Sequence, residues 1–176
     1  ALPYLKKKDV YSASINNLFG IADKELSLYS DAIFYYEEAL KDCTDEVSKQ
    51  SPLNNIAVVY IQQKKYGTAI KILESIIEKK LLEQAPVRKA GTIDNLGYAY
   101  FKNGKTEKGF SLMNEGYQLR KQINDFYGSI ESNLHLAEFY SKTDFKKSTQ
   151  YAQSAYEIAT KFNSVDERLK ALSFLI

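Results

Sequence analysis

The chain has 176 residues, of which 24 are basic and 22 acidic, for a net charge of +2. This balance, with the lysines in short scattered runs, lacks the clustered basic face that displaces counterions from phosphates, so we expect no nucleic-acid partner. Only 3 prolines and 8 glycines argue against disorder and against a turn-rich β-sandwich. No stretch approaches the ~20 apolar residues that cross a bilayer, so we expect no membrane contact by this segment. The single cysteine, Cys43, excludes an internal disulfide.

The first predicted pair of helices spans residues near 9–25 and 29–43. Its second helix carries two small residues, Ala32 and Ala39, seven positions apart. Seven residues make two helical turns, so both face the same way and allow another helix backbone to approach. Its first helix holds only a weak copy, at residues 16–20, of a segment that recurs further along.

The second pair is predicted near 51–63 and 66–81. Ser51 and Pro52 suggest an N-cap followed by proline at the first helical position, where its missing N–H costs nothing. In the second helix of this pair, Ile70, Leu73 and Ile76 recur at a spacing of three, which indicates an amphipathic helix.

The third and fourth pairs are predicted near 86–102 and 106–123, then near 127–141 and 145–162. The first helices of the second, third and fourth pairs share an eight-residue segment, found at Leu53–Tyr60, Ile93–Tyr100 and Asn133–Tyr140. Each copy has a small residue three positions before its tyrosine, and these small residues follow one another in steps of 40: Ala57, Gly97 and Ala137. Self-similarity at a fixed period predicts a stack of two-helix units.

A last helix is predicted from residue 165 to the end at Ile176. A further step of 40 from Ala137 reaches position 177, so the pattern predicts a chain cut inside a fifth unit. We therefore expect one domain over 1–176, a fragment of a longer protein, with units near 9–43, 45–81, 86–123, 127–162 and a partial unit at 165–176. The apolar end of the last helix predicts self-association through it. The chain opens on Ala1 rather than Met, which predicts a missing N-terminal segment and leaves the compartment open between cytoplasm and periplasm.

These units resemble the tetratricopeptide repeat. The third unit is similar to its pattern at Leu96, Gly97 and Tyr100, with a turn at Gly104 and Gly109 in the place of an alanine. The resemblance covers about residues 12–162. It implies an all-α fold, a right-handed α-α superhelix of about four helix pairs plus the first helix of a fifth. The ~40-residue period is longer than the usual 34 and is similar to that of kinesin light chains and bacterial peptide-sensing regulators.

The resemblance also implies a binding face, because the first helix of each pair lines the concave side in this family. The positions that carry over as peptide-binding are Asn55, Val58, Gln62, Asn95, Tyr98, Phe101, Lys102, His135, Glu138 and Lys142. Similar proteins use asparagine at the places of Asn55 and Asn95 to bind the backbone of an extended peptide, since an amide both donates and accepts. Lys102 and Lys142 could meet a carboxylate. The alternative is that the asparagines bridge neighbouring helices and the aromatic residues only pack.

No catalytic pattern stands out in the sequence. His135 is the only histidine, and no Ser/His/Asp order or metal-ligand spacing surrounds it. We therefore expect no enzyme, no metal and no cofactor. The resemblance implies a non-catalytic scaffold that binds a protein or peptide. The alternative is the ligand-sensing region of a bacterial signalling protein, either a histidine kinase or a transcriptional regulator.

Overall fold

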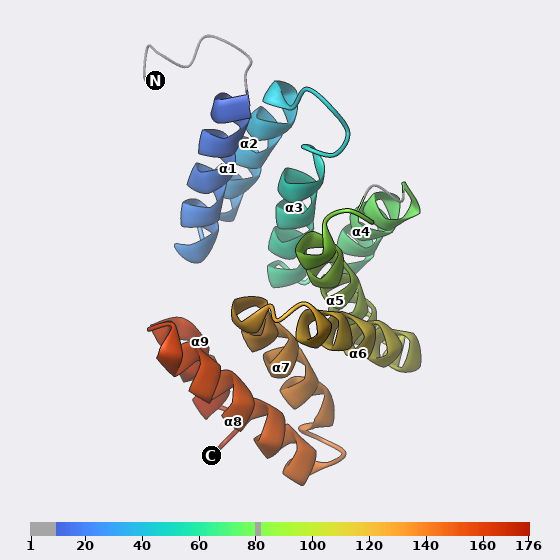
Figure 1. The fold of residues 1–176 in the computed structure, drawn as a ribbon, viewed down its shortest axis with the longest axis vertical. Coiled ribbons are helices and arrows are strands. Elements are labelled where there is room, and N and C mark those ends of the chain that lie inside the picture. The colour runs from blue at the N-terminus through green and yellow to red at the C-terminus, as the bar shows by residue number, and fades with distance from the viewer. Residues whose placement is uncertain (1–9, 80–81) are drawn as a thin grey trace. The chain divides into compact units, whose positions relative to one another are not determined.

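The computed structural model describes residues 10–79 and 82–176. Within these ranges the chain forms nine helices and no strand (Figure 1): α1 (Val10–Glu25), α2 (Tyr29–Asp42), α3 (Gln50–Gln62), α4 (Tyr66–Glu78), α5 (Pro86–Lys102), α6 (Thr106–Gln122), α7 (Phe126–Tyr140), α8 (Phe145–Lys161) and α9 (Val165–Leu172). The helices predicted from periodicity and turn residues are confirmed to within a few residues. The predicted helix start at residue 9 and the predicted helix end at 80–81 lie outside the described residues.

One predicted boundary is wrong. The helix α3 begins at Gln50 with Lys49 at the N-cap, rather than with a cap at Ser51. The turn before it already winds helically, because Gln50 N donates to Val47 O at 3.3 Å. Pro52 consequently lies inside the first helical turn, where its missing N–H still costs nothing. At α5, by contrast, Pro86 opens the helix as expected.

The chain divides into two compact units, one ending at Leu82 and the other starting at Glu83. In the first unit, α1 packs against α2 and α3, α2 packs against α3, and α3 packs against α4. Its core includes Ala32, Tyr36, Ile56 and Val59, and Ala39 is also fully buried, so the two small residues of α2 both face inward as predicted.

In the second unit, the helices pack as successive neighbours from α5 to α9, and α7 also contacts α5 and α9. The α5–α6 pair is held by glycines at the crossing. A Cβ on Gly97 would lie 2.5 Å from Met113 N, and a Cβ on Gly109 would lie 2.5 Å from Phe101 N. Small residues therefore allow the two helix backbones to approach, as predicted. At these two positions only glycine fits, because the Cβ of an alanine would clash with the backbone of the neighbouring helix.

A single kind of turn closes five of the described helices. In each, an amide after the helix donates to a carbonyl five residues back, as Lys65 N does to Tyr60 O (2.8 Å) and Lys105 N to Tyr100 O (2.9 Å). This bond defines the Schellman motif, which needs one residue in the left-handed region. The residues with positive φ at these turns are Ser27, Lys64, Gly104, Asn124 and Asn163.

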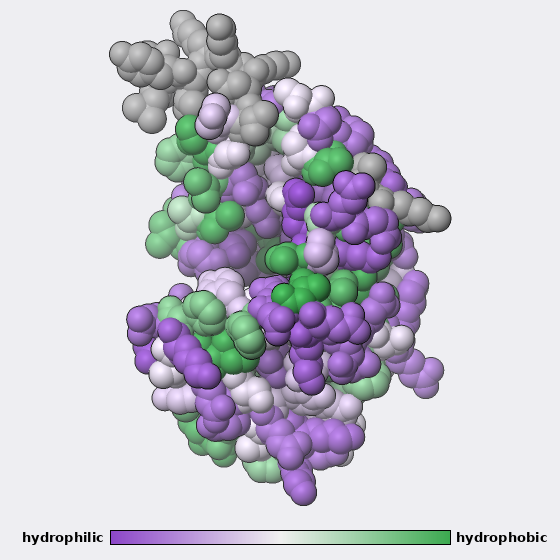
Figure 2. Space-filling view, viewed as in Figure 1, coloured by the Kyte–Doolittle hydropathy of each residue, from purple (hydrophilic) through white to green (hydrophobic). Residues whose placement is uncertain are grey.

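Apolar side chains are exposed on α1 of the first unit. Tyr11, Leu18 and Phe19 have exposed fractions of 79%, 63% and 42%, and this side shows as green at the upper left of Figure 2. None of the described helices is long and apolar enough to cross a membrane.

Candidate functional site

Polar and aromatic side chains meet where α5 packs against α7. Asp94, Tyr98 and Lys102 repeat every four residues along α5 and so share one face of that helix. Their counterparts on α7, at a spacing of three, are Ser132, His135 and Glu138. We call these six residues the α5–α7 polar cluster.

Asp94 forms the buried end of this cluster. Its side chain is fully buried, and its Oδ2 accepts from Ser132 Oγ at 2.9 Å and lies 3.2 Å from His135 Nδ1. Arg120 of α6 approaches the same carboxylate, with Nη2 at 3.8 Å from Oδ2. A buried carboxylate needs such partners, because burial without them disfavours the charged form.

His135 is held between this carboxylate and an aromatic ring. Its imidazole stacks on Tyr98 with the ring centroids 3.9 Å apart and the planes 9° from parallel. Burial acts to lower the pKa of His135, but the charge of Asp94 and the hydrogen bond to it outweigh burial. The pKa is raised as a result. The imidazole therefore serves as a fixed part of the surface, with one nitrogen committed to Asp94.

Glu138 forms the half-exposed end of the cluster. Its carboxylate accepts from Tyr98 Oη at 2.6 Å and from Lys102 Nζ at 2.5 Å. Burial acts to raise the pKa of Glu138, but these two hydrogen bonds outweigh it and lower the pKa. The side chains of Lys102 and Glu138 are 29% and 30% exposed, so the pair stays reachable from solvent.

The structure thus brings together four of the ten residues predicted for peptide binding: Tyr98, Lys102, His135 and Glu138. Phe101 packs beside them, with its ring centre 5.4 Å from that of Phe139, and Lys142 is exposed in the turn that follows α7. Asn95 is buried, with 4% of its surface exposed. Their binding role stays a prediction.

The other three predicted residues lie on α3 in the first unit. Asn55 Nδ2 donates to Asn17 Oδ1 of α1 at 3.0 Å, which is the helix-bridging role left open as the alternative. Val58 is half-buried and Gln62 is exposed.

Asp94, Ser132 and Arg120 were missed by the sequence reasoning. One signal was available for Asp94, since it is an acid at the second position of the repeated segment, where the other two copies have Asn54 and Leu134. Nothing in the local sequence marks Arg120, whose 5% exposure arises only from packing.

No protein-family model matches the chain. Among curated relatives, the photosystem I assembly protein Ycf3 of Prochlorococcus marinus (strain NATL2A) is 33% identical over 86 residues, which are 49% of this chain and 46% of the relative. The chain spans about half the length of the curated relatives it matches.

Solved structures resemble the chain more completely, though at low sequence identity. A Rap protein complexed with competence and sporulation factor matches with a TM-score of 0.79 and 17% identity, over 92% of this chain and 46% of that one. The TPR2AB domain of yeast Sti1, in a complex with pHSP90, matches with a TM-score of 0.52 and 19% identity, over 93% of this chain and 71% of that one. These neighbours are tetratricopeptide-type helical-repeat proteins. The expected all-α helical-repeat fold is therefore confirmed, and similarity to the long-repeat subgroup stays a prediction.

Proposed function

We propose that this chain, whose fold is of the tetratricopeptide type, is a non-catalytic scaffold that binds a protein or peptide through the surface carrying the α5–α7 polar cluster. The observation that carries the proposal is the half-exposed arrangement of Tyr98, Lys102 and Glu138 over buried Asp94. It offers an aromatic face, a cation and a carboxylate in fixed positions. Fixed side chains bind with a small loss of conformational entropy, and aromatic residues are enriched at protein interfaces.

The comparisons support the same class of function. The Rap and Sti1 structures are complexes with competence and sporulation factor and with pHSP90, and the curated relatives are named as assembly proteins. An assembly role, in which this chain holds another protein during its incorporation into a complex, agrees with both. The seven predicted residues of the second unit remain the proposed contact set, with Tyr98, Lys102, His135 and Glu138 at its centre. Asn55, Val58 and Gln62 stay a separate prediction for the first unit.

Peptide selection tests this proposal and does not require the natural partner to be identified first. A random peptide library is panned against the chain, and the affinities of the selected peptides are measured by calorimetry. We expect Tyr98→Ala and Lys102→Ala to weaken binding at least tenfold each, since both remove fixed contacts. The matched control is Lys147→Ala on α8, an exposed lysine that lies over the ring of Tyr140. Selected peptides that bind all the variants equally would overturn the assignment of this surface.

The second candidate is the ligand-sensing region of a bacterial signalling protein, a histidine kinase or a transcriptional regulator. It is favoured by the similarity to the Rap complex over 92% of this chain. The test is the sequence of the complete gene. A kinase or DNA-binding module in the same polypeptide would support this candidate, and its absence would remove it.

A further inference from the structure

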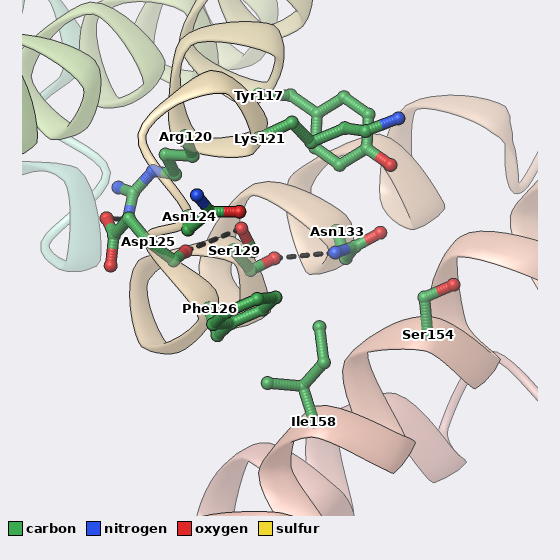
Figure 3. A pocket seen from close by; sticks show the side chains of 10 residues that line it. All are labelled: Tyr117, Arg120, Lys121, Asn124, Asp125, Phe126, Ser129, Asn133, Ser154 and Ile158. Carbon is green, nitrogen blue, oxygen red and sulfur yellow. Dashed lines mark hydrogen bonds and ion pairs between the residues drawn. The ribbon is translucent and has the colours of Figure 1, made fainter.

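A pocket of about 330 Å³ lies in the second unit, between the end of α6, the first half of α7, and α8. Figure 3 shows the side chains that line it, which come from these three helices and from the α6–α7 turn. Its volume is at the lower end of the range for small-molecule sites, which are apolar with a few placed polar groups. Tyr98, Lys102 and Glu138 are not among the residues that line it.

Asn133 is the most informative residue in this pocket. It is 2% exposed, its Nδ2 donates to Ser129 O at 2.7 Å, and its Oδ1 has no hydrogen-bond partner among the described residues. Figure 3 shows this oxygen turned away from Ser129, toward the side where Tyr117 and Ser154 lie. A buried acceptor without a donor destabilises the fold.

The repeats show that the fold does not need an asparagine at this position. The first residue of the repeated segment is Leu53 in the second helix pair and Ile93 in the third, and the fourth pair has Asn133. An apolar residue there would remove the unpaired oxygen. A ligand that supplies an N–H donor would satisfy this oxygen.

Apolar and aromatic side chains form part of the pocket wall, beside polar and charged ones. Tyr117 of α6, Phe126 at the start of α7 and the half-buried Ile158 of α8 all line it. Phe126 is 61% exposed although it lies at the edge of a cavity. A flat ring placed among these side chains would cover apolar surface that water now contacts.

The charge at the pocket favours an anion slightly. Arg120 is 5% exposed and is paired with Asp125, Nη1 to Oδ2 at 3.2 Å, and Asp125 also accepts from the N–H of Gly128. Lys121 lies with its Nζ 5.5 Å from the centre of the Tyr117 ring, and it makes no ion pair within the part of the chain that the structure describes. Of the two basic side chains that line the pocket, Arg120 is therefore paired with a carboxylate and Lys121 is not.

We propose that this pocket binds a small aromatic acid that carries an N–H donor. The ring lies among Tyr117, Phe126 and Ile158, the N–H donates to Asn133 Oδ1, and the carboxylate lies near Lys121. The inference concerns a free small molecule and does not depend on a protein partner.

The experiment uses three matched probes on the whole chain, followed by ¹H–¹⁵N NMR titration. Indole-3-acetate has the ring, the N–H and the carboxylate; 1-methylindole-3-acetate lacks the N–H; tryptamine replaces the carboxylate with an ammonium group. We expect indole-3-acetate to shift the amides of Tyr117, Ser129 and Asn133. Methylation should weaken binding about tenfold, because the buried oxygen then stays unpaired. Tryptamine should bind about threefold more weakly, since an exposed charge contributes little.

Two variants assign these preferences to residues. Asn133→Leu should bind both indole acids equally while its melting temperature stays at or above that of the wild type. Lys121→Gln should remove the preference for the acid over the amine. The matched control is Lys105→Gln, since Lys105 also lies over a tyrosine ring, at 5.2 Å from the centre of Tyr100, but does not line the pocket.

A third variant keeps the test decisive if Asn133→Leu does not fold. Ser154→Trp places a large side chain at the edge of the pocket and should abolish binding, whereas Ser111→Trp, at an exposed serine of α6 away from the pocket, should not. The proposal is overturned by a titration to 10 mM that shifts none of the three amides. It is also overturned by equal binding of the three probes, or by binding that survives Ser154→Trp.

Discussion

Asp94 shows how one buried charge organises its surroundings. Asp94 belongs to α5, and its carboxylate forms hydrogen bonds with Ser132 and His135 of α7. Arg120 of a third helix, α6, also approaches this carboxylate. The cost of burying the charge is offset only while these partners stay in place, and removing one partner of a buried ionic group typically costs about 3–5 kcal/mol. The same carboxylate fixes the ring of His135 and, through the ring stack, the orientation of Tyr98.

The raised pKa of His135 makes stability depend on pH. A histidine whose pKa is higher in the folded state contributes stability that is fully present below the unfolded value, about 6.5, and is lost as the pH rises through the folded value. The free energy of unfolding should therefore fall as the pH rises above about 6.5, by about 1.4 kcal/mol for each unit by which the pKa is raised. Urea unfolding at a series of pH values measures this.

The variant Asp94→Asn tests the cause. It removes the charge that raises the pKa of His135 and leaves the burial that lowers it, so the pKa should drop below its ordinary value. Because the chain has a single histidine, its ¹H NMR signals give the pKa without assignment. Asp144→Asn, which retains a side chain able to cap α8, should leave that pKa unchanged. An unaltered pKa in Asp94→Asn would contradict the role given to Asp94.

A glycine matters for the packing of two helices only where their backbones approach each other closely. Gly97 lies at the crossing of α5 and α6, where an added Cβ would be 2.5 Å from a backbone nitrogen, whereas nothing lies within 4 Å of a Cβ added to Gly67 in α4. The two glycines therefore have different consequences for stability although both are helical.

Alanine at the two positions should have opposite effects. Gly97→Ala should lower the free energy of unfolding by about 1–3 kcal/mol, because the helices must move apart. Gly67→Ala should raise it by up to about 1 kcal/mol, because alanine loses less backbone entropy in a helix. Thermal and urea unfolding followed by circular dichroism measure both. Equal effects of the two changes would show that the α5–α6 crossing can relax.

The helices were predictable because their signals are local. Apolar spacing in α4 and the turn at Asn103 and Gly104 depend on neighbours in the sequence alone. The α3 start was missed because its preceding turn is itself helical.

The polar cluster was only half predictable, because Asp94 meets His135 across 41 residues, and a local pattern does not show which faces of two helices meet. The unpaired oxygen of Asn133 likewise emerges only from packing.

Across the molecule, each unit is held together by contacts between helices that are close in sequence. Stability in such a stack is approximately a sum of local interfaces, so a helix that has a neighbour on one side only is the least protected. In the second unit α9 packs against α8 and α7. Its remaining face exposes a row of apolar side chains, with exposed fractions of 55%, 60% and 37% for Val165, Leu169 and Leu172.

This face should make the 176-residue chain associate with itself. We expect a weak dimer, with a dissociation constant of about 0.1–1 mM, because the face of an eight-residue helix buries less than the ~800 Å² per partner of a stable interface. Sedimentation equilibrium between about 10 µM and 1 mM would show the apparent mass rising. Leu169→Lys should abolish the rise by placing a charge in the contact. Ser111→Lys adds a charge at an exposed position of α6, outside α9, and removes no apolar surface, so it should leave the dimer in place. If both variants associate like the wild type, the contact does not involve α9.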